Sequence, residues 1–308
     1  MDKRSKIFVA GHKGLVGSAI LRALQKKGYV NIVTRTRGQL DLFNEKEVAS
    51  FFAREKPEYI FIAAAKAGGI MANDTKPAEF IFENLKIQNN IIHNAYLSSV
   101  EKLLFLGSSC IYPKSARQPI IEKYLLTGPL EETNAPYAIA KIAGISMCQS
   151  YNRQYGTNFI SAMPTNLYGP NDNFDLTTSH VIPAMLRKFH DAKSQQKEEV
   201  VLWGSGTPKR EFLHVDDLAE ALVFLMKKYD KSEIINIGTG KDISIKKLAL
   251  MIKKTTGFDG RIVWDKTKPD GTLRKLLDTS KIRKIGWKNK IELKKGIEKT
   301  YKWYLENE

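Results

Sequence analysis

A glycine-rich turn between two apolar segments near the N-terminus places the strongest constraint on the fold. Residues 6–10 are short, apolar and β-prone, and residues 18–27 have the pattern of an amphipathic helix. Gly11, Gly14 and Gly17 lie between them with the spacing G-x-x-G-x-x-G. In a strand–turn–helix unit, such glycines let backbone N–H groups approach a pyrophosphate at the N-terminus of the helix. The turn therefore predicts the beginning of a dinucleotide-binding domain, although a helix entry with incidental glycines has the same pattern.

Strand and helix patterns alternate through the first half of the chain. Residues 57–65, 102–107 and 158–163 are continuous apolar runs, which are typical of parallel strands buried on both faces. Residues 80–99 and 137–155 have helical patterns, and Gly156 ends the second. The alternation predicts an α/β fold with a doubly wound parallel sheet (Rossmann).

The pattern loosens after residue 165 into loops rich in Gly, Pro and Asn with shorter helices. We expect a cofactor domain over 1–165, rejoined by about 212–240. We expect a smaller α/β substrate-binding lobe over 166–308.

The second predicted strand, residues 30–34, indicates which dinucleotide binds. NAD sites of this fold usually place an Asp or Glu at its end to hold the ribose 2′-hydroxyl. Here no carboxylate occurs before Asp41, whereas Arg37 follows the strand and Lys13 lies in the glycine turn. Cations there suit a 2′-phosphate, so the sequence predicts NADP(H). The alternative is that Arg37 and Lys13 are solvated loop charges.

Composition predicts a soluble cytoplasmic protein. The 308 residues are 43% hydrophobic and 27% charged, and no apolar run approaches the length of a membrane span. The N-terminal residues run directly into the first strand, so we expect no signal peptide. Two cysteines fit a reducing compartment, and neither has the neighbours of a metal site. The net charge of +16 is dispersed, so we expect no nucleic-acid partner.

Two segments carry groups suited to carbonyl chemistry. Tyr137 and Lys141 lie one helical turn apart, where an ammonium would lower a phenol pKa that is ordinarily about 10. Ser108 or Ser109, at the end of a strand, could hold a carbonyl oxygen. With a nicotinamide at the glycine turn, these groups predict a hydride-transfer site. Each group alone also fits a surface helix or an ordinary loop.

These motifs resemble those of the extended short-chain dehydrogenase/reductase family, and the resemblance covers nearly the whole chain. It is closest to the nucleotide-sugar epimerase/reductases of that family. The segments that carry it are residues 107–113 (GSSCIYP), 136–144 (PYAIAKIAG), 163–170 (MPTNLYGP), 179–183 (SHVIP), 203–217 (from WGSG to REFLHVDD) and 268–272 (KPDGT). The resemblance implies conversion of GDP-4-keto-6-deoxy-D-mannose to GDP-L-fucose with NADPH, and a homodimer.

The same resemblance implies the site residues. The catalytic residues would be Ser108, Cys110, Tyr137, Lys141 and His180. The cofactor would contact Gly11, His12, Lys13, Gly14, Leu15, Val16, Gly17, Arg37, Asp41, Leu42, Leu106, Gly107, Ser108, Ser109, Lys141, Pro164, Thr165, Asn166, Leu167 and His180. The GDP-sugar would contact Lys188, Trp203, Arg210 and Asp270.

Cys110 and His180 are the residues that would distinguish an epimerase from a simple reductase. A ketone at C4 acidifies the C3–H and C5–H bonds, and epimerisation then needs a base on one face and an acid on the other. A thiol and an imidazole can both exchange protons near neutral pH. Taken alone, Cys110 also fits a small buried residue and His180 a packed or surface histidine.

Several alternatives remain open. The chain could be a nucleotide-sugar 4-reductase, a dehydratase or a non-reducing epimerase of the same family, or a non-catalytic NADP-binding regulator. We expect Cys148 to pack in the core, and His12 and His214 either to be structural or to support residues that contact the ligands. The pair Asp216-Asp217 is expected to cap a helix over 218–228.

Overall fold

The computed structural model describes residues 1–268 and 270–307, so Pro269 of the 268–272 motif lies outside the described residues. Its largest feature is a six-stranded, wholly parallel sheet with the order β2-β1-β3-β4-β5-β9. The strands are β1 (Ile7–Ala10), β2 (Ile32–Val33), β3 (Tyr59–Ile62), β4 (Lys102–Leu106), β5 (Phe159–Pro164) and β9 (Ile235–Ile237). The chain reverses direction across the sheet at β1 and β3, where ligands bind in open parallel sheets.

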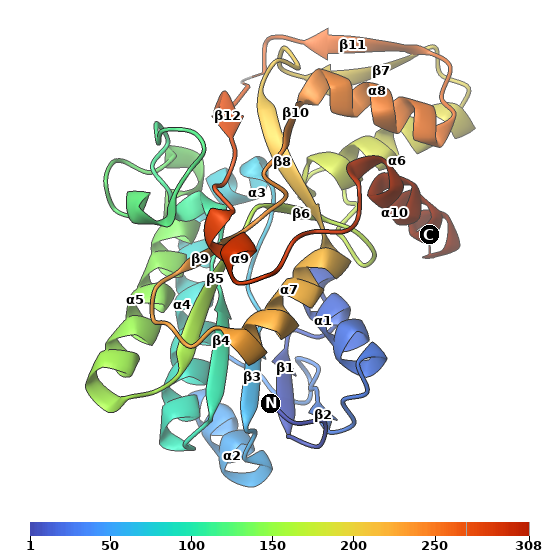
Figure 1. Ribbon diagram of the computed structural model, residues 1–308. Helices are drawn as coiled ribbons and strands as arrows, with labels where there is room; N and C mark the ends of the chain where they lie inside the picture. Colours follow the sequence, from blue (N-terminus) through green and yellow to red (C-terminus); the bar gives the residue numbers. More distant parts are fainter. Residues whose placement is uncertain (269, 308) are drawn as a thin grey trace.

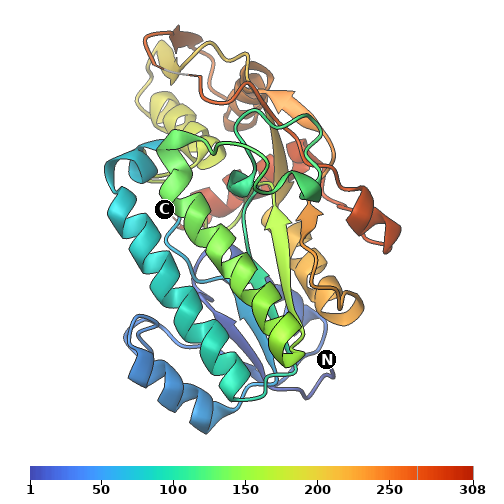
Figure 2. The same cartoon turned by 90° about the vertical axis from the view of Figure 1, so that its left-hand side faces the viewer.

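Helices cover both faces of this large sheet (Figure 1). On one face α1 (Leu15–Lys26) and α7 (Val215–Lys228) pack on alternate residues of β1 and β3, such as Val9 and Phe61. On the other face lie α2 (Glu45–Glu55), α4 (Pro77–Leu97) and α5 (Ala135–Tyr155). Figure 2 shows α4 and α5 side by side along the length of the sheet. The doubly wound α/β fold is therefore confirmed.

A second assembly lies beyond the carboxyl ends of the large sheet, at the top of Figure 1. Strand β8 (Lys209–His214) pairs with β6 (Asn166–Tyr168), β10 (Asp242–Ser244) and β12 (Arg274–Lys275). A separate ribbon joins β7 (Glu199–Trp203) to β11 (Arg261–Asp265). The helices here are α6 (Val181–Ser194), α8 (Ile245–Thr256) and α10 (Leu293–Asn307), and a third apolar cluster fills the space among them.

The short elements α3 (Ile70–Thr75) and α9 (Ser280–Lys284) complete the helices named here. Within the described residues, no helix is long and apolar enough to cross a membrane.

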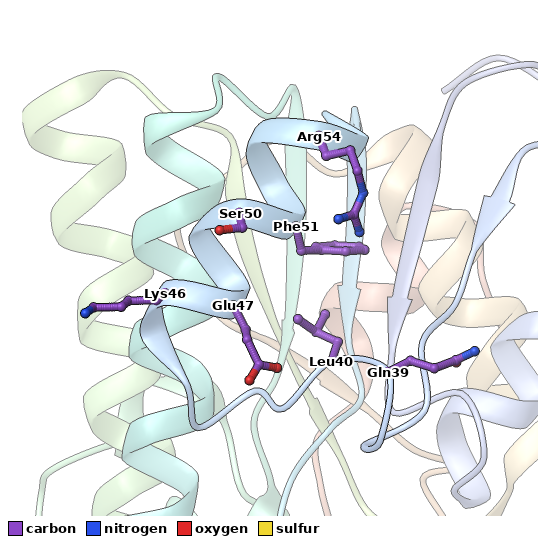
Figure 3. A pocket seen from close by; sticks show the side chains of 7 residues that line it. All are labelled: Gln39, Leu40, Lys46, Glu47, Ser50, Phe51 and Arg54. Carbon is purple, nitrogen blue, oxygen red and sulfur yellow. The ribbon is translucent and has the colours of Figure 1, made fainter.

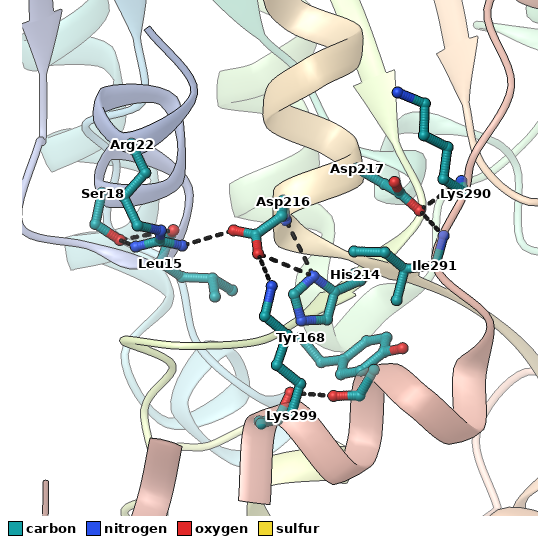
Figure 4. A network of polar contacts seen from close by, with 12 residues as sticks. Leu15, Ser18, Arg22, Tyr168, His214, Asp216, Asp217, Lys290, Ile291 and Lys299 are labelled. Carbon is teal, nitrogen blue, oxygen red and sulfur yellow. Dashed lines mark hydrogen bonds and ion pairs between the residues drawn. The ribbon is translucent and has the colours of Figure 1, made fainter. Parts of the chain in front are cut away.

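The start of α7 differs from the sequence expectation. The helix begins at Val215, and its N-cap is His214, whose Nδ1 accepts a hydrogen bond from Asp216 N at 3.2 Å. The prediction that Asp216 and Asp217 cap the helix is therefore wrong. Their side chains instead leave the helix for other elements (Figure 4): Asp216 meets Arg22 of α1, and Asp217 accepts from Ile291 N at 2.8 Å. Because the His214 imidazole occupies the capping position, both carboxylates are available for these longer-range contacts.

Candidate active site

The glycine turn after β1 has the geometry that a dinucleotide site requires. Gly11 has φ +83°, and a Cβ there would lie 2.7 Å from the backbone of Ala64, just after β3. A Cβ on Gly17 would lie 2.1 Å from the carbonyl oxygen of Gly11. Gly14 is the N-cap of α1 and has more open surroundings, so its glycine leaves room for an approaching ligand. Leu15 and Val16 follow as the first residues of α1 and pack against the core.

The charges around this turn fit a phosphate. Lys13 and Arg37 are exposed, and within the described residues neither forms an ion pair with a carboxylate. Arg35, by contrast, pairs with Glu55 at 2.7 Å and is occupied. His12 also faces the turn with a buried Nδ1 that has no hydrogen-bond partner among the described residues. Burial, and then the charge of Lys13, lower the pKa of His12, which favours the neutral imidazole as a possible donor or acceptor.

The loop after β2 is ordered by contacts within the loop and by a contact with α4. The Asp41 carboxylate accepts a hydrogen bond from Phe43 N at 3.1 Å, and the carbonyl of Leu42 accepts one from Asn90 of α4 at 2.8 Å. The Arg37 guanidinium lies 4.9 Å from the centre of the Phe43 ring. These contacts place Arg37, Asp41 and Leu42 on one short loop.

Ser108 and Tyr137 meet at the carboxyl end of β4. Gly107 and Ser108 follow the strand directly, and the Ser108 hydroxyl accepts a hydrogen bond from Cys110 N at 3.2 Å. The phenol of Tyr137, which projects from the first turn of α5, lies close enough to the same hydroxyl for the hydroxyl to lower its pKa. A Cβ on Gly107 would lie 2.3 Å from the sulfur of Met163, so a larger residue here would require that side chain to move. Ser109, the neighbouring candidate, is buried.

The ionisation of Tyr137 differs from the sequence expectation. Burial, followed by the electrostatic effect of Cys110, raises the pKa of Tyr137, and only the Ser108 hydroxyl opposes them. Lys141, whose Nζ lies 5.7 Å from the ring centre and donates to the carbonyl of Leu106 at 2.9 Å, does not lower it. With a pKa of about 8, Lys141 is already neutral at the higher pH at which Tyr137 would lose its proton. Tyr137 is therefore a neutral phenol at neutral pH in this state, which makes it a proton donor.

Lys141 is itself perturbed. Its side chain is 3% exposed, and burial lowers its pKa to about 8. Its Nζ lies 5.0 Å from the centre of the Phe105 ring and has no carboxylate partner within the described residues. A buried cation of this kind is ready to bind an anion or a ribose hydroxyl.

Cys110 and His180 come from different elements of the chain and share one neighbouring lysine. Cys110 lies in the turn after β4, and Lys275 of β12 donates to its Sγ at 3.4 Å. His180 is the N-cap of α6, and the residue as a whole is exposed. Surrounding protein atoms, and then the charge of Lys275, lower its pKa. Both residues therefore lie near Lys275, which the sequence did not identify. No local pattern could have found it, because Lys275 and Cys110 are 165 positions apart.

One aromatic and three cationic groups extend the site away from the thiol. Trp203 is 51% exposed, and Lys188 and Lys268 lie 5.7 Å and 5.6 Å from its ring. Arg210 is half-buried; burial lowers its pKa, while Asp270 and Cys110 oppose this effect. Arg210 therefore lies close enough to both Asp270 and Cys110 to interact with their charges. An aromatic face followed by a guanidinium matches a base followed by a pyrophosphate.

The Asp270 side chain is fixed by hydrogen bonds from Ser205. Its carboxylate accepts two hydrogen bonds of 2.7 Å, from the backbone N and the hydroxyl of Ser205. A Cβ on Gly204 would lie 2.3 Å from the same carboxylate. These contacts lower the pKa of Asp270, so it is a carboxylate at neutral pH.

Glu211, a further residue that the sequence did not single out, joins the two sheets beneath this site. It is fully buried, and its carboxylate accepts from Thr239 N (2.6 Å), Gly240 N (2.7 Å) and Leu277 N (3.0 Å). Its carbonyl accepts from the Asn166 side chain at 2.8 Å. The carboxylate therefore anchors β12, which carries Lys275, to the end of β9. Residues 164–167, predicted to contact the cofactor, lie at this junction: Pro164, Thr165, Asn166 and Leu167.

A separate hollow of about 260 Å³ lies beside α2 (Figure 3). Its lining residues are Gln39, Leu40, Lys46, Glu47, Ser50, Phe51 and Arg54. Leu40 and Phe51 belong to the core beneath α2, so the hollow is a depression over that core and not part of the Ser108–Tyr137 site. Within the described residues, no three His, Cys, Asp or Glu side chains are grouped as metal ligands.

Comparisons with known proteins agree with this geometry. Residues 7–238 match the model of the NAD dependent epimerase/dehydratase family. The chain is 61% identical over 307 residues to a putative GDP-L-fucose synthase 2 from Arabidopsis thaliana, a match that covers 100% of this chain and 94% of that protein. It is 54% identical to a GDP-L-fucose synthase from Escherichia coli strain K12, covering 99% and 98%.

A solved structure is similar over the same length. MlghC, a GDP-mannoheptose C4 reductase from Campylobacter jejuni with NADP bound, superposes with a TM-score of 0.92 at 47% identity. The match covers 99% of each chain.

Proposed function

Because the chain belongs to the NAD dependent epimerase/dehydratase family, we propose that it is a bifunctional epimerase/reductase acting on a GDP-sugar. It converts GDP-4-keto-6-deoxy-D-mannose to GDP-L-fucose by epimerising C3 and C5 and reducing C4 with NADPH. The substrate assignment is supported by identities of 54–61% over the whole chain to GDP-L-fucose synthases. The observation that carries both activities is a thiol, Cys110, beside the Ser108–Tyr137 pair.

The residues present fit NADP(H). Gly11 and Gly17 leave no space for side chains, Gly14 leaves the helix N-terminus accessible, and Lys13 and Arg37 are cations suited to a 2′-phosphate. When bound, NADPH supplies the hydride for C4. The Lys141 ammonium would hold the ribose.

Reduction uses Tyr137 and Ser108. The Ser108 hydroxyl would hold the C4 oxygen, and the Tyr137 phenol would give that oxygen its proton. The raised pKa of Tyr137 keeps the proton on the phenol at neutral pH, so the group is in the protonation state that reduction requires. The tyrosinate that results would lie next to Lys141, which is buried and can supply compensating charge.

Epimerisation uses Cys110 and His180. One would remove the proton from C3 or C5, and the other would return a proton to the opposite face. Ser108 and Tyr137 would hold the C4 oxygen while it carries enolate charge. Lys188, Trp203, Arg210 and Asp270 would bind the GDP moiety through stacking, phosphate and hydroxyl contacts.

We assign the two ligands to two parts of the chain. Residues 1–165, rejoined by about 212–240, would bind the cofactor, and 166–308 would bind the sugar nucleotide. We place the protein in the cytoplasm, where the free thiols Cys110 and Cys148 stay reduced. It would form a homodimer through helices that flank the large sheet.

A second candidate is a C4 reductase without epimerase activity. The similarity to MlghC, a GDP-mannoheptose C4 reductase, favours it. Such an enzyme would need Ser108, Tyr137 and Lys141 but would have no use for Cys110 and His180. The two candidates therefore differ in the configuration of the product.

The deciding experiment combines the protein with NADPH and GDP-4-keto-6-deoxy-D-mannose. Absorbance follows NADPH, and NMR identifies the sugar. One NADPH oxidised for each GDP-L-fucose formed is the expected result. A product that is reduced but not epimerised would establish the C4 reductase, and no oxidation would overturn both candidates.

A further inference from the structure

The loop that ends at His180 is ordered from within. Residues 171–180 form the last part of the connection from β6 to α6. The Asp175 carboxylate accepts bonds from the N–H groups of Thr177 (3.0 Å) and Thr178 (2.9 Å) and from the hydroxyls of both threonines. Ser179 N donates to the carbonyl of Asp175 at 2.9 Å. These bonds shape the loop, but they do not attach it to the large sheet.

Gly69 provides that attachment. It lies in the segment 63–69 that follows β3, and its N–H donates to the carbonyl of Thr178 at 2.9 Å. A Cβ on Gly69 would lie 2.6 Å from the carbonyl oxygen of Ser179, the residue before His180. Gly69 has φ −66°, which any residue can adopt, so space and not backbone conformation requires glycine here.

The segment that carries Gly69 is itself held by two buried amides. Asn84 of α4 donates to the carbonyl of Lys66 at 3.0 Å and accepts from its N–H at 3.1 Å. Asn73 of α3 donates to the carbonyls of Gly68 (2.8 Å) and Gly69 (3.0 Å). Both amides are at most 6% exposed. The segment is therefore a rigid support.

We propose that Gly69 is the positioning residue for His180 in epimerisation. Its backbone contact fixes the loop 171–180 against the carboxyl end of β3 and so sets the place of the imidazole near Lys275 and Cys110. This role rests on the proposed function. Ser108, Tyr137 and Lys141 belong to the end of β4 and to α5, so hydride transfer does not depend on the contact in the same way.

The test substitutes Gly69→Ala and measures the two half-reactions separately. Epimerisation is followed as deuterium entering C3 and C5 of GDP-4-keto-6-deoxy-D-mannose in D₂O, with NADP⁺ in place of NADPH. Hydride transfer is followed as NADP⁺ reduction by GDP-L-fucose, which loses a hydride from C4 and a proton from the C4 hydroxyl and needs no epimerisation.

We expect deuterium incorporation by Gly69→Ala to fall about tenfold to a hundredfold, as for a displacement of up to about 1 Å in an acid/base group. GDP-L-fucose oxidation should remain within about threefold of the wild type. A second variant, Asn73→Ser, loosens the support without adding bulk and should shift the ratio in the same direction. Asp74→Ala, an exposed change on the same helix, should leave the ratio unchanged.

Two results would overturn the positioning role. One is an equal loss of both half-reactions in Gly69→Ala and Asn73→Ser, which is what general damage would give. The other is wild-type incorporation in both variants. A wild-type protein that oxidises GDP-L-fucose but incorporates no deuterium would instead overturn the proposed epimerase, and this role with it. If Gly69→Ala does not fold, Asn73→Ser decides the question.

Discussion

At the scale of single residues, burial decides the ionisation of the Tyr137–Lys141 pair. Helical spacing brings the two side chains together, but each also loses solvent, and this disfavours the charged form of both. The pKa of Tyr137 therefore rises, and that of Lys141 falls to about 8. The spacing alone could predict that the residues are neighbours but not which effect is larger.

The pKa of Lys141 predicts how cofactor affinity depends on pH. In the cofactor-free protein, Lys141 is charged below pH 8 and neutral above it. If the ammonium binds the cofactor, the Kd for NADPH should rise about tenfold per pH unit above 8. Fluorescence titration of NADPH between pH 7 and 10 measures this. Lys141→Arg should abolish the pH dependence, because its guanidinium stays charged; a wild-type Kd that is flat to pH 10 would contradict the assignment.

Cys110→Ser should separate epimerisation from reduction. A hydroxyl is a far weaker base than a thiolate, so deuterium entry at C3 and C5 should fall about a hundredfold or more. NADP⁺ reduction by GDP-L-fucose should persist, because Ser108, Tyr137 and Lys141 are unchanged. Cys148→Ala is the matched control, since Cys148 is fully buried in the core, as expected from the sequence. Normal deuterium entry in Cys110→Ser would remove the thiol from the mechanism.

At the scale of elements, Asp216 links its own helix to two others, and His214 caps that helix beside it (Figure 4). Asp216 pairs with Arg22 of α1 at 2.8 Å and with Lys299 of α10 at 2.6 Å, while its own helix, α7, begins on His214. His214 is 1% exposed, and burial lowers its pKa to about 4. The imidazole is therefore neutral at neutral pH, and its 3.7 Å approach to Asp216 is not an ion pair.

This burial predicts a loss of stability on acidification. The folded pKa of His214 lies below the unfolded value of 6.5, so the unfolded state takes up the proton first. The contribution is complete above pH 6.5 and is lost between pH 6.5 and about 4, on the order of 3 kcal/mol in total. His214→Asn keeps a good N-cap without titrating. Urea unfolding from pH 7 to 5 should show a smaller loss of unfolding free energy in the variant than in the wild type. If the unfolding free energy falls equally with pH in both proteins, the effect belongs to another group.

The elements themselves were largely predictable, and their ends were not. The helix expected over 137–155 is observed as Ala135–Tyr155, with Gly156 in the left-handed conformation that ends it. The strand expected over 57–65 forms only at Tyr59–Ile62, because the backbone after Ile62 turns to pass Gly11 and reach Gly69. Contacts with distant segments set such ends, and a local pattern does not contain them.

At the scale of the whole molecule, the site forms where two sheets meet, and its junction could not be predicted from sequence. Glu211 was visible only as a member of a motif, yet its carboxylate joins β8, the end of β9 and the segment after β12. Gly238 is required beside it, since a Cβ would lie 2.3 Å from that carboxylate. The residue types at the site were predictable from motifs. In contrast, Lys275, which contacts Cys110, and Gly69, which contacts the loop before His180, come from segments without a motif.

The exposed face of α4 and α5 predicts the assembly (Figure 2). Phe82 and Leu97 of α4 are 60% and 61% exposed, and Tyr155 of α5 is 46% exposed. Ser146 and Ser150 lie exposed on α5, and small residues there let a partner helix approach closely. Two copies that pack these helices against each other would bury the aromatic and aliphatic groups in a symmetric interface. Because each chain has a mass of 34.9 kDa, sedimentation should detect a species of about 70 kDa.

Phe82→Glu tests this face, because it places a charge where the dimer would bury an aromatic ring. We expect it to shift the sedimenting species to the monomer, while the exposed change Lys241→Glu, on the loop before β10, should leave the dimer intact. The catalytic groups project from the opposite side of α5, toward β4, so the monomeric variant should retain GDP-L-fucose oxidation. A wild-type protein that sediments as a monomer at micromolar concentration, or a Phe82→Glu variant that remains dimeric, would move the interface away from α4 and α5.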